Sequence, residues 1–320
     1  MNILVTGANG QLGQCLRDIA EENQNSENTW FWTDVADIEG RDVRHLDITD
    51  EKAIECFFKD NSINVCVNCA AYTNVDKAED DQELARKLNA DAPGILAKAC
   101  KAHDAKLIHI STDYVFNGTS FMPLTEERMT LPTSVYGKTK LEGEENIVKS
   151  GCDYLIFRTA WLYSEYGNNF VKTMLKLVEN NEEVKVVNDQ IGTPTYAGNL
   201  AMLIYYIIAE VKPLEKTGIY HYTDEGVCSW YDFAQGIACE RSLYEIPEDK
   251  GLAAIIPVST KEFYGDKKHA SRPFYSVLNK GKVKKDFISQ FETITTDIPH
   301  WMVPLNMCVR KIMEKREKNG

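Results

Sequence analysis

The chain of 320 residues lacks any long, uncharged apolar run. A helix that crosses a membrane needs about 20 consecutive, mostly apolar residues, so we expect no membrane partner. The first residues, "MNILVTGANG", also lack a basic leader followed by a long apolar segment. We therefore expect no secretory signal and a cytoplasmic location.

Basic residues are in the minority, with 36 Lys and Arg against 48 Asp and Glu, which gives a formal net charge of −12. A field of this sign repels a phosphate backbone, so nucleic acid is not an expected partner. A small anionic ligand is still compatible with this charge, because a nest of backbone N–H groups can hold phosphate locally.

A disulfide framework is also missing, because the nine cysteines are odd in number and scattered. In a chain of this length they indicate reduced residues of the core. Cys66 and Cys69 form a CxxC pattern, but it lies in the apolar run "INVCVNCAA". This context is typical of a buried strand and offers too few ligands for zinc, so we predict no metal site.

Short apolar runs and helix-like stretches alternate along the first half of the chain. The runs lie at 2–6, 29–33, 63–68, 105–111 and 153–159, and the helical patterns at 11–22, 50–60, 81–103 and 134–149. This alternation predicts an α/β fold, a Rossmann-type doubly wound parallel sheet with helices on both faces. We expect a smaller mixed α/β C-terminal substrate lobe beside it. The predicted dinucleotide-binding domain is 1–165 with a returning segment at about 196–220, and the predicted substrate-binding lobe is 166–195 and 221–320.

A glycine-rich loop follows the first predicted strand and opens a helix. Gly7, Gly10 and Gly13 have the spacing G-x-x-G-x-x-G. Glycine lets the backbone approach a ligand closely, and the start of a helix offers free N–H groups and a positive dipole end. The loop therefore predicts a pyrophosphate site and, with it, a dinucleotide cofactor.

Acidic residues follow the next strands. Asp34 lies about 20 residues after the loop, where a carboxylate can bind the ribose diol of NAD. Arg41 and Arg44 could instead meet a 2′-phosphate, so the choice between NADH and NADPH stays open. Asp47 is a further candidate, although an acid before a helix can also be a simple N-cap. Small side chains at Ala70 and Ala71, after the third strand, would let a cofactor pass closely.

A hydroxyl, a phenol and an ammonium group form the candidate catalytic set. Thr112 ends a strand in "HISTDYVFNG", and Tyr136 and Lys140 are four residues apart in "VYGKTKLEGE". Residues at that spacing share one face of a helix. A nearby cation lowers the pKa of a phenol, which could then protonate a developing alkoxide near neutral pH while Thr112 holds the carbonyl oxygen. The pattern predicts reduction of a carbonyl by a nicotinamide.

Together these motifs resemble those of the extended short-chain dehydrogenase/reductases. The segments "STDYVFNG", "VYGKTKLEGE", "FRTAWLY", "NDQIGTPT" and "ASRP" are similar, in order and spacing, to the dTDP-4-dehydrorhamnose reductase family. The resemblance covers residues 1 to about 300. It implies NAD(P)H-dependent reduction of the 4-keto group of dTDP-6-deoxy-L-lyxo-4-hexulose to dTDP-L-rhamnose.

The resemblance also implies roles for single residues. Tyr136 would be the proton donor, and Lys140 would hold the nicotinamide ribose. The cofactor would be lined by Gly7, Gly10, Gln11, Leu12, Gly13, Asp34, Asp47, Ile48, Ala70, Ala71, Tyr72, Thr73, Tyr136 and Lys140. The nucleotide-sugar substrate would meet Thr112, Asp113, Trp161, Asn169 and Arg272. For Asn169 a helix cap, and for Arg272 a surface salt bridge, are equally compatible with the sequence.

Some relatives of this kind bind magnesium between subunits through an acid in the first helix. Here Cys15 stands at that place, so we expect no such metal bridge, and a homodimer stays open. Two other functions are also compatible with the motifs. One is a nucleotide-sugar epimerase or dehydratase of the same superfamily. The other is a non-catalytic regulatory subunit similar to that of methionine adenosyltransferase.

Overall fold

A parallel sheet of seven strands, in the order β11-β6-β5-β4-β1-β2-β3, forms the centre of the larger lobe. The computed structural model describes residues 1–23, 27–36, 41–209, 215–245, 251–290 and 297–319. The strands are β1 (Asn2–Thr6), β2 (Thr29–Asp34), β3 (Arg44–His45), β4 (Val65–Asn68), β5 (Lys106–Thr112), β6 (Asp153–Thr159) and β11 (Gly218–His221). This order confirms the predicted doubly wound α/β fold. The short strands β3 and β11 were not predicted.

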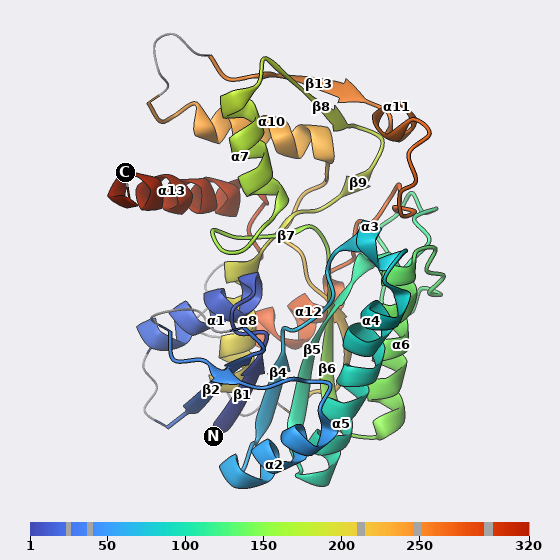
Figure 1. Cartoon of the computed structure of the whole chain (residues 1–320), viewed down its shortest axis with the longest axis vertical. Helices are drawn as coiled ribbons and strands as arrows, with labels where there is room; N and C mark the ends of the chain where they lie inside the picture. The colour runs from blue at the N-terminus through green and yellow to red at the C-terminus, as the bar shows by residue number, and fades with distance from the viewer. Residues whose placement is uncertain (24–26, 37–40, 210–214, 246–250, 291–296, 320) are drawn as a thin grey trace.

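Helices cover both faces of this sheet (Figure 1). One layer contains α1 (Gln11–Glu22), α8 (Ala197–Ala209) and α12 (Gly281–Asp286), and the other contains α2 (Glu51–Asn61), α5 (Ala92–Ala102) and α6 (Val135–Ser150). Ile3 and Val5 pack into the first layer and Leu4 into the second, since successive side chains of a strand point to opposite faces. The continuous apolar runs of the sequence follow from this double burial.

Short helical segments follow the strands β4 and β5 in the chain. They are α3 (Val75–Ala78), α4 (Gln82–Arg86), the π-helical turn η1 (Lys87–Asp91) and the 3₁₀ turn η2 (Asp113–Val115). The segments α4, η1 and α5 follow one another directly, as the single predicted helix 81–103 suggested.

The smaller lobe lies beyond the carboxyl ends of the sheet strands (Figure 1). Its helices are α7 (Phe170–Asn180), α10 (Trp230–Arg241), α11 (Thr260–Tyr264) and α13 (Met302–Asn319), and η3 (Ile288–Gln290) follows α12. Three two-stranded sheets complete it: β7 (Leu162–Tyr163) with β10 (Thr195–Tyr196), β9 (Ile191–Gly192) with β12 (Cys228–Ser229), and β8 (Glu183–Val187) with β13 (Ala254–Val258).

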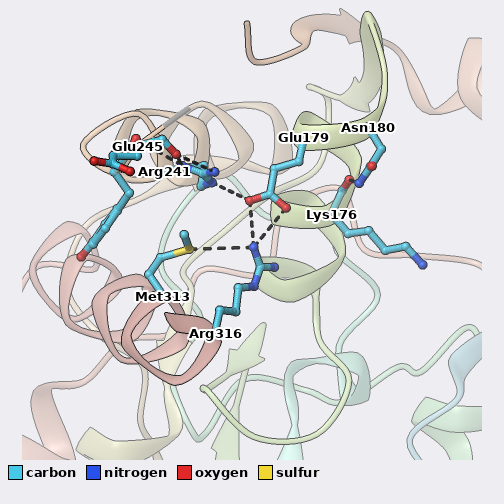
Figure 2. A network of polar contacts seen from close by, with 8 residues as sticks. Lys176, Glu179, Asn180, Arg241, Glu245, Met313 and Arg316 are labelled. Atoms are coloured by element: carbon cyan, nitrogen blue, oxygen red, sulfur yellow. Dashed lines mark hydrogen bonds and ion pairs between the residues drawn. The ribbon is translucent and has the colours of Figure 1, made fainter. Parts of the chain in front are cut away.

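An ion-pair network holds three helices of the smaller lobe together (Figure 2). Glu179 of α7 accepts hydrogen bonds from Arg241 of α10 and from Arg316 of α13. Arg241 also donates to the backbone carbonyls of Tyr244 and Glu245. These ion pairs and hydrogen bonds fix the relative position of α7, α10 and α13. The apolar faces of the three helices form the core of the lobe.

The cysteines are all free thiols, in agreement with the absence of a disulfide framework. Cys66 is buried in β4, as the apolar context of the CxxC pattern indicated. The expectation that the cysteines lie in the core is wrong for Cys56 and Cys239, because α2 and α10 turn these two positions to solvent. Within the described ranges no helix is both long and apolar enough to cross a membrane.

Candidate active site

The glycine loop requires glycine for steric reasons. Gly7 follows β1 with φ +66°, and a Cβ there would lie 2.6 Å from the backbone nitrogen of Ala70. Gly10 is the N-cap of α1 and has no side chain to cap the helix. The first-turn N–H groups of α1 thus have no capping side chain, and a helix start of this kind suits a phosphate group.

Two acidic side chains lie near this loop. The Asp34 carboxylate accepts hydrogen bonds from the backbone N–H groups of Asn9 (3.0 Å) and Val35 (2.8 Å). Asp47 accepts from the backbone and the hydroxyl of Thr49, and these bonds lower the pKa of Asp47.

The N-cap of α2 is Asp50, whose side chain accepts from two first-turn N–H groups. The alternative that Asp47 is only a helix cap is therefore wrong.

The two arginines considered for a 2′-phosphate stack on aromatic rings. The Arg41 guanidinium lies 5.6 Å from the ring centre of Tyr166, and that of Arg44 lies 5.0 Å from Phe31. Neither arginine belongs to the cavity lining described next.

A cavity of about 770 Å³ lies outside the carboxyl ends of the sheet strands, between the two lobes. In open α/β sheets this is the place where ligands bind. Most predicted site residues line it: Gly7, Gly10, Gln11, Leu12, Asp34, Asp47, Ile48, Ala70, Ala71, Thr73, Thr112, Asp113, Tyr136, Lys140, Trp161, Asn169 and Arg272.

Gly13 and Tyr72 do not belong to that lining. A Cβ on Gly13 would lie 2.5 Å from the carbonyl oxygen of Gly7, so this glycine lets α1 pack on the loop. The Tyr72 hydroxyl donates to Asp81, and its backbone N–H donates to Asn89. These contacts hold the Tyr72 side chain against Asp81, outside the cavity lining.

The start of α6 places the candidate catalytic tyrosine. Ser134 caps this helix by accepting from the N–H of Gly137 at 3.1 Å. A Cβ on Gly137 would lie only 2.2 Å from the carbonyl oxygen of Tyr114. Glycine between Tyr136 and Lys140 therefore lets α6 lie against η2, the turn that directly follows Thr112 at the end of β5.

Burial controls the protonation of the polar groups around Tyr136. It raises the pKa of Tyr136 to about 12, although a hydrogen bond with Thr112 opposes this effect. We expected Lys140 to lower the pKa of this phenol. That expectation is wrong for this structure, because the loss of solvation on burial raises the pKa. Burial likewise raises the pKa of Asp113 to about 6. A phenol that stays protonated suits an acid that donates its proton to an alkoxide.

Lys140 lies on the same face of α6 as Tyr136 and is almost fully buried. Its ammonium nitrogen donates to the carbonyl oxygen of Ile110 at 2.6 Å and lies 3.4 Å from Nε2 of His109. Burial lowers the pKa of Lys140 to about 8. The cation is thus held against β5.

An aromatic stack forms the wall on the smaller-lobe side. Trp161 and Trp230 lie with ring centres 3.7 Å apart and planes 10° from parallel. Trp161 has φ +50°, a strained conformation for a non-glycine residue. A Cβ on Gly192 would lie 2.7 Å from the Trp161 ring, so glycine leaves room for the indole. Trp230 was not predicted as a site residue, because the capping box of Ser229 and Asp232 around it marks only the start of a helix.

Two predicted substrate contacts have structural partners as well. Asn169 caps α7 through the N–H of Lys172 and also donates to the side chain of Gln11. Arg272 forms two hydrogen bonds with Asp76 and is 17% exposed at its side chain. Both residues line the cavity while serving as a helix cap and a salt bridge, respectively.

The parallel sheet, the glycine loop and the Thr112, Tyr136 and Lys140 group define the class of short-chain dehydrogenase/reductases. The family model described as RmlD substrate binding domain matches residues 1–307. The dTDP-4-dehydrorhamnose reductase of Aggregatibacter actinomycetemcomitans is 37% identical over 287 residues, which cover 89% of this chain and 92% of the relative. The chain belongs to the dTDP-4-dehydrorhamnose reductase family.

Solved structures agree with this assignment. A dTDP-4-dehydrorhamnose reductase from Clostridium acetobutylicum superposes with a TM-score of 0.83 at 38% identity, covering 98% of this chain and 100% of that chain. The reductase from Bacillus anthracis, solved in complex with NADP, gives a TM-score of 0.81 at 34% identity, with 97% and 99% coverage. A UDP-glucose 4-epimerase from Thermus thermophilus is 16% identical and shares the fold alone.

Proposed function

We propose that this chain reduces the 4-keto group of dTDP-6-deoxy-L-lyxo-4-hexulose with NADPH or NADH to give dTDP-L-rhamnose. One observation carries the proposal: a single cavity joins the uncapped start of α1 to Thr112 and Tyr136. Family membership and the NADP complex of a relative at 34% identity support it. We also propose that the reaction takes place in the cytoplasm.

The residues of the chain fit a dinucleotide. Gly7 and Gly10 leave room for a pyrophosphate at the start of α1, and Asp34 lies where a ribose diol would be bound. Ala70 and Ala71 line the same cavity with small side chains. A bound nicotinamide would supply the hydride.

The protein side of the reaction is a proton transfer. Thr112 and Tyr136 both line the cavity, so both can contact one substrate oxygen. Tyr136 is protonated at neutral pH, and its hydroxyl can give this proton to the oxyanion that forms on reduction. Trp161 and Trp230 offer a flat apolar surface for the sugar, and the wall they form excludes water.

The test supplies dTDP-6-deoxy-L-lyxo-4-hexulose with NADPH and, in parallel, with NADH. A reductase consumes one cofactor for each sugar, and the product is identified as dTDP-L-rhamnose by NMR. Isomerisation of the sugar without net cofactor consumption would support an epimerase instead. Cofactor binding without any turnover would support a regulatory subunit.

A further inference from the structure

Arg272 lines the cavity at a point where the two lobes are in contact, and the mechanism above does not use it. It belongs to the segment 268–272, which follows α11 of the smaller lobe. This segment reaches the larger lobe at α3, where the backbone N–H of Ala270 donates to the Asp76 carboxylate at 3.0 Å. Asp76 lies beside Val75, which lines the same cavity. The contact of the two segments therefore forms part of the cavity wall.

The Asp76 carboxylate occupies one edge of the Arg272 guanidinium group. Its Oδ1 accepts from Nη1 of Arg272 at 3.0 Å, and its Oδ2 accepts from Nη2 at 2.6 Å. The hydrogen bond with Arg272 lowers the pKa of Asp76, so this side chain is ionised at neutral pH. The guanidinium carbon also lies 5.3 Å from the ring centre of Tyr264. A paired carboxylate and an aromatic ring thus fix the orientation of the guanidinium group.

The hydrogen bonds of Arg272 leave a second edge of this group without a partner. A guanidinium group has five N–H donors in one plane. Two of them bind Asp76, and Nη1 also donates to the carbonyl oxygen of Ala270 at 3.2 Å. The Nε–H and the remaining N–H of Nη2 have no acceptor among the residues that the structure describes. These two donors point side by side, which is the geometry that binds two oxygens of a phosphate group.

We propose that Asp76 is a positioning residue, which orients Arg272 so that its second edge binds the diphosphate of the nucleotide-sugar substrate. This inference rests on the proposed function, because that function supplies a ligand with a diphosphate. Asp76 comes from the larger lobe and Arg272 from the smaller one. The salt bridge thus joins the lobes and prepares the phosphate contact at the same time.

A purely Coulombic role of Asp76 predicts the opposite result. A carboxylate near the site repels a diphosphate, so its removal should strengthen binding of the anion. Removal of a positioning residue should weaken binding, because the guanidinium group regains its freedom and must be ordered again when the ligand binds. The sign of the effect therefore separates the two roles.

The first test measures binding of dTDP and of thymidine to the full chain by isothermal titration calorimetry. The ratio of the two affinities isolates the contribution of the diphosphate. In Asp76→Asn this ratio should fall about 10-fold, the size of one charge-assisted hydrogen bond. Asp80→Asn is the matched control, because Asp80 pairs with Lys268 of the same segment and both side chains are exposed. It should leave the ratio unchanged.

The second test asks whether Asp76 acts through Arg272. Arg272→Lys keeps the positive charge but loses the pair of parallel donors, so it should also lower the ratio. Asp76→Asn should then cause no further loss when it is added to Arg272→Lys. A general effect of Asp76 on the fold would instead lower the ratio again in the double variant.

An unchanged or larger ratio in Asp76→Asn would overturn the proposal, and so would a further loss in the double variant. A wild-type chain that binds dTDP no more tightly than thymidine would overturn it as well. Binding of dTDP needs neither cofactor nor turnover. A chain that shows the expected ratios but forms no dTDP-L-rhamnose would therefore refute the proposed reaction and leave the role of Asp76 in place.

Discussion

The two lobes hold their parts of the site by different means. In the larger lobe, the candidate catalytic groups follow the ends of parallel strands, and the backbone ladder of the sheet fixes them. In the smaller lobe, each paired strand is two to five residues long, and side chains do the positioning. Trp161, Trp230, Phe170 and Phe233 form one aromatic cluster there, and the ion pairs of Glu179 hold the surrounding helices (Figure 2).

The difference separates chemistry from recognition. A proton donor must be placed accurately, and hydrogen-bonded strands with fully buried neighbours provide that accuracy. An apolar wall for a sugar tolerates more variation, because dispersion contacts are spread over many atoms. We therefore expect the largest effects of mutation in the larger lobe and lesser effects in the smaller lobe.

The largest effect should follow from Tyr136→Phe. Loss of the proposed proton donor should lower kcat by about 10²–10⁴-fold, with little change in cofactor binding. The measurement is single-turnover hydride transfer together with a cofactor titration. Tyr205→Phe on α8 serves as the control and should keep the wild-type rate. Hydride transfer at the wild-type rate in Tyr136→Phe would show that Tyr136 is not the proton donor.

Buried charges should distinguish the lobes in stability. Glu144→Ala leaves Arg158 unpaired in the core and should lower the free energy of unfolding by about 3–5 kcal/mol. Glu179→Ala in the smaller lobe should cost about 1–3 kcal/mol, since Arg316 is half exposed and the buried Arg241 keeps its bonds to the carbonyls of Tyr244 and Glu245. Glu142→Ala, which loses an exposed pair with Arg86, is the control and should cost less than about 1 kcal/mol. Equal losses at Glu144 and Glu142, measured by denaturant unfolding, would contradict this ranking.

The pH dependence of stability should report the burial of His221 on β11. Burial lowers the pKa of His221 to about 3, below the ordinary value of 6.5. The unfolded chain therefore binds a proton first as the pH falls, and stability should decrease by up to about 1.4 kcal/mol per pH unit between those values. In His221→Asn, whose amide can still donate to the carbonyl of Leu124, this contribution should vanish. Parallel pH slopes for the two proteins in urea unfolding would show that His221 is not responsible.

The smallest effect should come from the aromatic wall. Trp230→Ala removes the stacking partner of Trp161, and an aromatic pair is worth about 0.5–1.5 kcal/mol beyond its buried area. KM for the nucleotide sugar should therefore rise about 2- to 10-fold, with a smaller change in kcat. Trp230→Phe should restore most of the affinity. Steady-state kinetics that show a larger loss in kcat than in KM would place Trp230 in the chemistry.

Much of the larger lobe could be predicted from the sequence, because its patterns depend on residues close together in the chain. Runs such as 2–6 and 105–111 are apolar throughout, because their strands are buried on both faces. Gly7 adopts a positive φ, which favours glycine, and the spacing of Tyr136 and Lys140 places them on one helix face. The smaller lobe gave weaker patterns, since its strands are too short to show a period.

What the sequence determined by itself was the order of elements, the glycine loop and the set of candidate catalytic groups, because these depend on neighbours a few residues apart. The tertiary structure decided the contacts between distant segments. It turned Tyr72 toward Asp81 and brought Trp230 onto Trp161. It also raised the pKa of Tyr136 and placed His109 beside Lys140. Burial and long-range pairing depend on the whole packed chain, so no short stretch of sequence reveals them.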